Sequence, residues 1–485
     1  MYWGDDMFRC FSFLLLLLAA VLPLHGFKLP ARIYPADCRV TLRFTPESAW
    51  AKKVCSAPKL RVYYMRDDRR FMDGGELRLQ KWQRIKFRRE AGAIVVDAEL
   101  RGEHEHAFVF QYDPPEKKAK RPAKGTKQTK AEKKAVAPEE RCVAVYTLKP
   151  DLFPLRPFKG EFHRHSNVSH DATVSPEEHV RYARACGLDI FDVSDHWKYE
   201  QNARVKKTVD ESGSGLGVYP GEEMHNHHAV LHTICIGGKR AMGTPERNEK
   251  TMAACKSIFD ELCRKFPNES KSELLSLAEA LRLIRQARAD GAVVIYCHPH
   301  WKPGFRYNSP IFFTRYLLSS GEVDAVEIAN GDFLAPGNFT TNALLHDIAA
   351  ETGRRIPVVS ASDTHNVSRV DSVRRMYNII FARDASFEEF KSALRGGRVV
   401  AANDCETRSH KHLRPLYFGT WRMVRLAEFI QETGYWGRHD RLCTRQAALI
   451  AKFLAGDTSV VPEIKKLADE IAALRDGLYY TPEAK

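Results

Sequence analysis

The sequence predicts an α/β protein built around a seven-stranded barrel, preceded by a small antiparallel β domain and followed by a helical C-terminal segment. Three observations lead to this prediction. Short apolar runs with a period of two fill residues 27–152. From residue 158, apolar runs of strand length alternate with longer helical segments, as in parallel strands joined by crossover connections. After about residue 412 only helical patterns follow, and the 485 residues leave room for two or three domains.

Residues 1–26 predict a secretory signal peptide. A short start with one Arg precedes the apolar run Phe11 to Leu22, and Gly26 offers a cleavage point. The run is shorter than the roughly 20 residues of a spanning helix, so export is favoured over a membrane anchor, which is the alternative. The pair Asp5-Asp6 is unusual for such a segment, so Met7 is an alternative start. No later stretch is apolar enough to span a bilayer. We therefore expect a periplasmic, cell-surface or extracellular protein.

The β domain, residues 27–152, is predicted from alternating runs such as CRVTLRF, AIVVDAEL, HAFVFQY and RCVAVYTL. Its last hairpin carries a Lys-rich loop, residues 115–138, in which KKAKRPAKGTKQTKAEKK holds nine basic residues and one Glu. This loop accounts for much of the formal charge of +14. Its composition predicts disorder, with a tether for nucleic acid or anionic glycan as the alternative. His104 and His106 have no carboxylate nearby in sequence and are interpreted as a surface pair without function.

The 11 cysteines include no C-x-x-C pair, which argues against a metal-thiolate site. Whether some of them pair in an oxidising compartment, for example among Cys38, Cys55 and Cys142, is left open.

The barrel, residues 153–412, contains seven strand candidates: KGEFHRH, LDIFDVSDH, GLGVYPGEE, LHTICIGG, AVVIYCHPH, VDAVEIANG and IPVVSASDTH. One helix is predicted from an N-cap at Ser175 to a stop at Gly187, and another from about Ser272 to Asp290. The helical segment 413–485 contains no ligand-like cluster. It is interpreted as a packing appendage or as an interface for a second subunit.

Nearly every strand of the barrel region ends in a metal-binding type of residue. His163 and His165 are two apart, so on a strand both side chains leave the same face. Further His, Asp and Glu residues close other strands: Asp195-His196, Glu222-Glu223, His298, and Asp363 with His365. The carboxyl ends of parallel barrel strands meet at one rim. The pattern therefore predicts a multinuclear metal centre, although a single such residue would more often be structural.

Taken in order, the motifs H-R-H with an Asp close behind, S-D-H, P-G-E-E, L-H-T, C-H-P and S-D-T-H resemble those of the PHP (polymerase and histidinol phosphatase) family. The resemblance covers about residues 158–400. It implies a distorted seven-stranded (β/α)7 PHP barrel that binds two or three divalent metal ions. It assigns His163, His165, Glu223 and Asp363 to one metal, with Glu223 bridging to a second. That second metal is held by His232 and His298, and the third by Asp171, His196 and His365.

Three of these assignments have competitors. Asp171 competes with His170, and the family spacing to the following helix favours Asp171. Glu222 competes with Glu223, which the Pro-Gly-x-Glu spacing selects. His225, His227 and His228 compete with His232, which opens an apolar strand as its family counterpart does.

Imidazole and carboxylate ligands suit Zn, Mn or Fe. Such cations lower the pKa of bound water from 15.7 toward roughly 7 and supply hydroxide, so hydrolysis of a phosphomonoester or phosphodiester needs no protein nucleophile. Cys297 is interpreted as a buried thiol. Asp195 is expected to orient a ligand, to shuttle a proton or only to cap the next loop. Arg164, His300 and Lys302 are as consistent with solvent exposure as with phosphate binding.

Two other functions are left open by the sequence. One is a metallohydrolase acting on a non-phosphorus ester or amide, and the other is a non-catalytic, metal-stabilised cell-surface binding protein. The expected partner is a small or polymeric phosphoester substrate. Nucleic acid and the oligomeric state are left open.

Overall fold

The computed structural model describes residues 26–66, 72–73, 76–77, 83–113, 139–225, 231–242, 249–331, 336–366, 376–404 and 415–481. Apart from Gly26, the predicted signal peptide lies outside these residues, as does the predicted Lys-rich loop 115–138. The chain forms two compact units. The N-terminal unit contains residues 1–154, 429–435 and 477–485, and the central unit contains residues 155–428 and 436–476.

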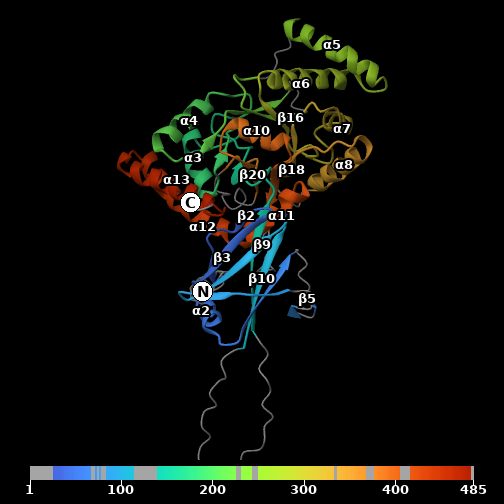
Figure 1. The fold of residues 1–485 in the computed structure, drawn as a ribbon. Helices are drawn as coiled ribbons and strands as arrows, with labels where there is room; N and C mark the ends of the chain where they lie inside the picture. The colour runs from blue at the N-terminus through green and yellow to red at the C-terminus, as the bar shows by residue number, and fades with distance from the viewer. Residues whose placement is uncertain are drawn as a thin grey trace, which may run out of the picture. The chain divides into compact units, whose positions relative to one another are not determined.

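The N-terminal unit contains two main sheets, with strand orders β1-β3-β9-β8 and β2-β11-β10-β4-β7 (Figure 1). All their pairings are antiparallel except that of β2 with β11, so the predicted hairpin around the Lys-rich segment, β10 with β11, is confirmed. The bounds are β1 Phe27–Lys28, β2 Ile33–Pro35, β3 Cys38–Pro46, α2 Ala49–Ser56, β4 Leu60–Arg66, β5 Met72–Asp73, β6 Glu76–Leu77, β7 Gln83–Ile85, β8 Arg88–Glu90, β9 Ala93–Leu100, β10 Glu105–Tyr112 and β11 Glu139–Leu148.

The period of two in β3 explains the core of this unit. Val40, Leu42 and Phe44 are buried while the residues between them are more exposed. Phe44 packs against Phe110 of β10, with ring centroids 5.0 Å apart. Apolar side chains from the two sheets thus share one core.

His106 corrects one interpretation of the sequence, because it is fully buried and not on the surface. Its Nδ1 lies 2.8 Å from the Tyr64 hydroxyl and its Nε2 lies 2.9 Å from the Thr147 hydroxyl. The β strand turns His106 inward, and both ring nitrogens are satisfied by hydroxyl groups. The absence of a carboxylate next to the pair in sequence therefore says nothing about its exposure.

The central unit is a mixed α/β structure with two sheets, ordered β14-β13-β12-β20-β21-β22 and β15-β16-β17-β18-β19. Each of the seven predicted strand segments contains at least one strand. The bounds are β12 Arg156–Glu161, β13 Ile190–Phe191, β14 Gly217–Val218, β15 Gly221–His225, β16 His232–Ile236, β17 Val293–Tyr296, β18 Ala325–Asn330, β19 Val358–Ala361, β20 Met376–Ala382, β21 Val399–Asn403 and β22 Leu416–Phe418.

The prediction that these strands are all parallel is wrong in part. β16 pairs antiparallel with both β15 and β17, and β20 pairs antiparallel with β12. The segment between His225 and His232 is too short for a crossover, which needs about a dozen residues, so the chain turns back directly. The strands β20 to β22 were not predicted. They extend the first sheet beyond β12.

Two isolated bridges connect ends of strands that belong to different sheets. Arg164, just after β12, forms a parallel bridge with Thr364, just after β19. His196, which follows β13, forms one with Glu223 of β15. The residues that the sequence places after these strands are therefore neighbours in space.

The core of the central unit lies on both faces of β17. Ile295 packs with Phe162, Ile234 and Val359 on one face of the strand. Val294 and Tyr296 face a second cluster built largely from α6 and α7. Burial on both faces explains why AVVIYC is a continuous apolar run without alternation.

The helices of the central region include both predicted ones. Ser175 caps α3 by accepting a hydrogen bond from Glu178 N at 3.3 Å. The second begins at Lys271 and is capped by Ser270, close to the predicted start. The helices from here to the C-terminus are α3 Pro176–Ala185, α4 Gln201–Ser212, α5 Glu249–Lys265, α6 Lys271–Ala289, α7 Ile311–Ser320, α8 Pro336–Thr352, α10 Phe387–Arg395, α11 Trp421–Glu432, α12 Tyr435–Leu454, η3 Thr458–Val460 and α13 Val461–Asp476.

A buried charge cluster attaches α12 and α13 within the central unit. Oδ1 of Asp189 accepts hydrogen bonds from Arg475 at 2.8 Å, from His439 at 3.1 Å and from Arg184 at 3.3 Å. The residues 477–481, in contrast, belong to the N-terminal unit, where Tyr480 N donates to Ile33 O at 2.8 Å. The C-terminal segment thus contributes to both units.

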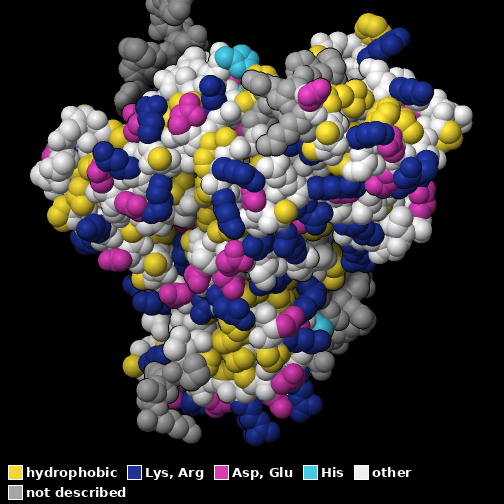
Figure 2. All heavy atoms as spheres, turned by 90° about the horizontal axis from the view of Figure 1, so that it is seen from above, with side chains coloured by type: hydrophobic (Ala, Val, Ile, Leu, Met, Phe, Trp, Pro, Cys, Tyr) yellow, Lys and Arg dark blue, Asp and Glu magenta, His cyan; other side chains and the backbone are white. Residues whose placement is uncertain are grey.

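Charged side chains of both signs are mixed on the face drawn in Figure 2, where Lys and Arg lie among Asp and Glu and do not form a single basic field. None of the nine described cysteines, which include Cys38, Cys55 and Cys142, is in a disulfide bond. Among the described helices, none combines the length and apolar composition needed to cross a bilayer.

Candidate metal centre

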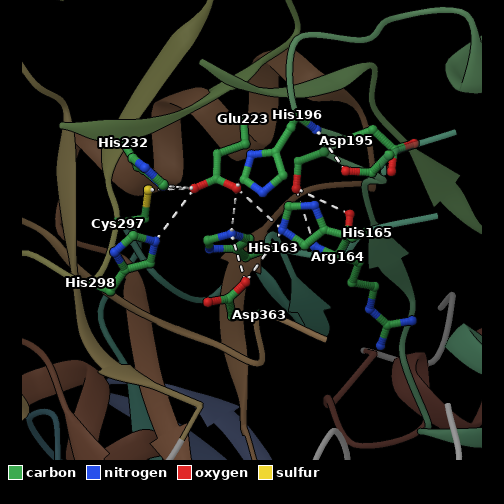
Figure 3. Close-up of polar contacts among 12 residues, drawn as sticks. His163, Arg164, His165, Asp195, His196, Glu223, His232, Cys297, His298 and Asp363 are labelled. Carbon is green, nitrogen blue, oxygen red and sulfur yellow. Dashed lines mark hydrogen bonds and ion pairs between the residues drawn. The ribbon is translucent and has the colours of Figure 1, made fainter. Parts of the chain in front are cut away.

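Glu223 lies at the middle of a cluster of imidazoles (Figure 3). Its Oε2 atom is 3.4 Å from His163 Nε2, 3.3 Å from His165 Nε2 and 3.0 Å from His196 Nδ1. Its Oε1 atom faces a different pair, His232 Nδ1 at 2.8 Å and His298 Nε2 at 3.4 Å. The carboxylate is buried and each oxygen faces its own set of nitrogens.

Asp363 approaches the first of these sets from the end of β19. Its Oδ1 lies 3.2 Å from His163 Nε2 and 3.3 Å from His165 Nε2. His163 and His165 follow β12, and Nε2 of each ring faces the carboxylates of Glu223 and Asp363. Their two-residue spacing therefore places both rings on one side of the chain.

Asp171 forms the third group of potential ligands. Its Oδ2 is 3.0 Å from His196 Nε2 and 3.2 Å from His365 Nε2. Ser169 Oγ donates to the other oxygen, Oδ1, at 2.7 Å and so orients the carboxylate. His165 borders this group as well, because its ring stacks on that of His365 with centroids 4.2 Å apart.

The structure thus brings together all nine residues that the sequence singled out. Four groups of three or four residues, one of which includes Cys297, have ligand atoms within 4.8 Å of one another: His165, Asp171, His196 and His365; His163, His165 and Glu223; His163, His298 and Asp363; Glu223, Cys297 and His298. The groups share members, so the cluster is continuous.

Of the described competitors, Glu222 faces away from the cluster, whereas His170 and His225 lie at its border. Glu222 is buried on the opposite face of β15, where its Oε2 accepts a hydrogen bond from Met242 N at 2.7 Å. His170 is exposed, with its ring centroid 5.6 Å from that of His196. His225 is buried and stacks on His232 at 4.5 Å, and neither ring nitrogen has a partner. His227 and His228 lie outside the described residues.

Buried atoms without hydrogen-bond partners show that this cluster fits cations. They include Nε2 of His163, both ring nitrogens of His165, Nδ1 of His196 and Oε2 of Glu223. An unsatisfied buried polar atom costs about 1–3 kcal/mol, so several at one place call for a shared partner. Imidazole nitrogens and carboxylate oxygens that converge in this way are the donor set of Zn, Mn and Fe sites.

The electrostatics of the cluster are dominated by its carboxylates. Burial by itself disfavours both the ionised carboxylate of Glu223 and the protonated imidazole of His165. The positive charges of His163 and His232 nevertheless hold the pKa of Glu223 well below its usual range. Burial also lowers the pKa of His165, but the nearby carboxylates of Asp363 and Glu223 outweigh it and raise this pKa to about 10. The carboxylates therefore attract positive charge into a buried space.

Backbone strain accompanies these positions. His298 and Asp363 have φ values of 29° and 51°, and Trp197, next to His196, has 55°. Non-glycine residues rarely adopt positive φ, and such outliers cluster at functional sites. The strain allows the chain to turn sharply after β17 and β19 while it directs these side chains toward Glu223.

Sequence reasoning missed Glu327, which supports two of these residues from β18. Its Oε1 lies 2.7 Å from His163 Nδ1, and its Oε2 accepts from His298 N at 2.9 Å and from Asn330 Nδ2 at 2.7 Å. The signal in the sequence was a lone carboxylate within the apolar segment VDAVEIANG. Glu161 acts similarly by accepting hydrogen bonds from His163 N and Ser362 N, each at 3.0 Å.

The remaining sequence candidates have structural roles. Asp195 accepts hydrogen bonds from Ser166 N and Oγ, both at 2.5 Å, and so holds the loop after His165. Cys297 is buried with Sγ 3.6 Å from Glu223 Oε1, and burial raises its thiol pKa well above the usual value, which disfavours a nucleophile. Arg164 is buried and pairs with Glu161, and it points away from Glu223 in Figure 3.

Known proteins were compared with the chain at the level of sequence and of structure. No protein-family model matches it, and no curated protein matches it either. One similar solved structure is a two-domain protein from Bacteroides vulgatus that contains a predicted PHP-like metal-dependent phosphoesterase. It has a TM-score of 0.40 and 19% identity, over 58% of this chain and 72% of that chain.

Two further similar structures have lower scores. A proposed metal-dependent phosphoesterase from Bifidobacterium adolescentis has a TM-score of 0.29 and 17% identity, over 42% of this chain and 87% of that one. An amidohydrolase from Chromobacterium violaceum with bound sulfate has a TM-score of 0.27 and 17% identity, over 43% and 87%. In its motifs the chain resembles the PHP family, and two of these solved structures are described as metal-dependent phosphoesterases.

Proposed function

We propose that this chain is a metal-dependent hydrolase of phosphate esters, acting on a phosphomonoester or a phosphodiester. The observation that carries the proposal is Glu223, whose two oxygens face separate sets of buried imidazoles. A carboxylate placed in this way holds two cations close together. Paired cations are suited to the attacking and leaving oxygens of a phosphoryl group.

The proposed ligands follow the sequence assignment. His163, His165, Glu223 and Asp363 would hold one divalent ion. Glu223, His232 and His298 would hold a second, and Asp171, His196 and His365 a third. Two or three ions of Zn, Mn or Fe are compatible with these donors. His165 borders both the first and the third group, which supports a compact centre.

When bound, such cations lower the pKa of water and neutralise the charge of a phosphoryl group. The chain's own residues place and orient the donors. Glu327 accepts a hydrogen bond from His163 Nδ1–H, so that Nε2 of this ring is the nitrogen left to bind a metal ion. The buried thiol of Cys297 lies 3.6 Å from Glu223 Oε1, beside the positive-φ residue His298.

We also propose that the seven segments that contain β12 to β19, with β14 and β15 in a single segment, form the distorted seven-stranded (β/α)7 barrel implied by the PHP resemblance, within residues 153–412. The bridges Arg164 to Thr364 and His196 to Glu223 support this arrangement, because they bring strand ends of both sheets together. In the order of the chain, the β domain, 27–152, would precede this barrel and the helical segment, 413–485, would follow it.

The test uses the purified full-length protein loaded with Mn or Zn. Nitrophenyl phosphate, bis-nitrophenyl phosphate and nitrophenyl acetate separate a monoesterase, a diesterase and a carbonyl esterase. Metal content per chain is measured for the wild type and for Asp363→Ala. Asp210→Ala, an exposed carboxylate paired with Lys206 on α4, is the matched control. We expect phosphate release by the wild type and the control, and loss of both metal and activity in Asp363→Ala.

Two results would point to the other functions. Turnover of the acyl ester alone would indicate a metallohydrolase of a non-phosphorus ester or amide. Bound metal without turnover of any substrate would favour a non-catalytic, metal-stabilised binding protein at the cell surface.

Export through the N-terminal segment is a separate proposal, based on its signal-like sequence. N-terminal sequencing of protein recovered from outside the cytoplasm should begin near residue 27. Recovery of an intact N-terminus from the cytoplasm would contradict it.

A further inference from the structure

An exposed tryptophan lies directly beside the proposed metal ligands. Trp301 is 47% exposed, and its ring centroid is 5.6 Å from that of His298 and 6.4 Å from that of His232. Both histidines face the same oxygen of Glu223. A phosphoryl group at this centre would therefore place its organic substituent within reach of the Trp301 ring.

The loop that carries Trp301, residues 299–310, is held in place by polar contacts. Trp301 N donates to His298 O at 2.9 Å, and Asn308 N donates to Trp301 O at 2.9 Å, which closes the loop. His300 is buried, with its Nδ1 2.8 Å from the Thr341 hydroxyl on α8. The backbone is thus positioned without burial of the aromatic side chains, since Phe305 is 87% exposed. Exposed apolar side chains on an anchored loop next to a reactive centre indicate ligand binding.

The charge of this loop matches an anionic ligand. Residues 299–310 contain Lys302 and Arg306 and no Asp or Glu. Lys302 Nζ lies 4.4 Å from the ring centroid of Tyr307, and the Arg306 guanidinium carbon lies 5.4 Å from that of Phe305. Both cations therefore stay beside aromatic rings on the same loop, where they add a positive field to the stacking surface.

Trp197, which lies beside His196, provides a contrast. It is only half-buried, but its ring packs against His225 with centroids 3.9 Å apart. Its backbone is strained by a positive φ. Trp197 thus packs against the cluster itself, whereas Trp301 presents ring surface to solvent.

We propose that Trp301 is a specificity-determining residue, which stacks on an aromatic ring in the organic part of the substrate. This inference rests on the proposed phosphoesterase function and names a substrate class for it. The enzyme selects phosphate esters that carry an aromatic group within a few atoms of phosphorus over alkyl phosphates of the same size.

The test compares benzyl phosphate with cyclohexylmethyl phosphate. The two esters are similar in size and in leaving-group chemistry, and only the first has an aromatic ring. An aromatic pair adds about 0.5–1.5 kcal/mol beyond its buried area, so we expect kcat/KM of the wild type to favour benzyl phosphate by up to about tenfold. Trp301→Ala should abolish this preference, and Trp301→Phe should restore most of it.

Trp421→Ala is the matched control, because Trp421 is 73% exposed on α11 and its ring lies against Arg425. It should keep the wild-type preference. Metal content and thermal midpoint, measured for every variant, verify that the centre and the fold are intact. The inference would be overturned if Trp301→Ala kept the wild-type preference for benzyl phosphate. It would also be overturned if kcat/KM fell equally for both esters while the metal stayed bound.

Binding of non-hydrolysable analogues separates this inference from the proposed function. Benzylphosphonate and cyclohexylmethylphosphonate are titrated calorimetrically into metal-loaded wild type and Trp301→Ala. If the wild type hydrolyses neither of these esters, nor nitrophenyl phosphate or bis-nitrophenyl phosphate, the proposed function fails. The inference about Trp301 then stands only if benzylphosphonate binds several-fold more tightly than its saturated analogue in the wild type and not in Trp301→Ala. Equal affinities would refute it.

Discussion

His163 Nδ1 lies 2.7 Å from Oε1 of Glu327, a residue 164 positions further along the chain. Both side chains are buried, and Glu327 also accepts a hydrogen bond from the backbone of His298. One carboxylate thus orients a ring that follows β12 and the turn after β17. A carboxylate behind a metal-binding histidine fixes the tautomer and increases the basicity of the ligating nitrogen.

Replacing Glu327 should therefore weaken metal binding without removing a proposed ligand. We expect Glu327→Ala to lower metal affinity about 10- to 100-fold, and Glu327→Gln to lower it less, because the amide oxygen still accepts one hydrogen bond. Titration against a chelating indicator measures the affinity. Glu351→Gln, an exposed glutamate paired with Arg315, is the control. Wild-type affinity in Glu327→Ala would show that His163 needs no such support.

Glu223 and Glu222 allow a comparison of adjacent residues on one strand. Glu223→Gln replaces an oxygen that faces imidazoles by an amide that cannot bridge two cations, so we expect loss of at least one metal ion per chain and about a hundredfold or larger loss of activity. Glu222→Gln keeps an acceptor for Met242 N and should retain full metal content. Metal analysis with phosphate release measures both variants. Equal effects of the two substitutions would contradict the central position of Glu223.

Metal binding should stabilise the fold, because the ligands converge only in the folded chain. A cation present at 100 times its dissociation constant adds about 2.7 kcal/mol to the free energy of unfolding. We therefore expect the thermal midpoint to rise on addition of Mn or Zn and to fall with a chelator. The shift should be absent in Asp363→Ala and present in Asp210→Ala. A midpoint that does not respond to metal in the wild type would argue against the centre.

The buried pair of Asp189 and His439 predicts a pH dependence of stability that is independent of the metal centre. Burial opposes both charges, but the positive charge of His439 and of Arg475 lowers the pKa of Asp189, and Asp189 raises the pKa of His439 well above its usual value. The stabilisation by Asp189 is present above its unfolded pKa, near 3.8, and is lost as pH falls below it. The stabilisation by His439 is complete below the pKa of this group in the unfolded chain, near 6.5. It is lost as pH rises through the higher pKa that His439 has in the folded protein.

The pair should therefore stabilise the central unit most between about pH 4 and 6.5. His439→Gln should cost on the order of 3 kcal/mol in this range, because it leaves a buried charge less compensated, and the cost should decrease at alkaline pH. Urea unfolding at a series of pH values measures it. His346→Gln, whose side chain is 87% exposed, should give no such profile. A pH-independent cost for His439→Gln would mean that the imidazole is neutral in the fold.

Part of this architecture was predictable because its signals are local. The cap at Ser175 and the alternation of buried residues in β3 depend on neighbours only a few positions apart. The strand-end positions of His163, His165 and Asp363 follow from the same kind of pattern. Residue types with the chemistry of ligands, placed after apolar strands, were enough to predict that such side chains would meet, whereas the choice of Asp171, Glu223 and His232 over their competitors came from the PHP resemblance.

What the sequence by itself determined, then, is the α/β class, seven strand segments and two helices of the central region, and most of the side chains that gather around Glu223. Only the tertiary structure decided that β16 and β20 run antiparallel to their neighbours, that His106 is buried, and that Glu327 supports His163. The physical reason is the distance along the chain between the residues that interact. Capping and periodicity are set by residues within one or two turns, whereas strand partners and buried carboxylate contacts depend on free energies between residues that are far apart in the chain.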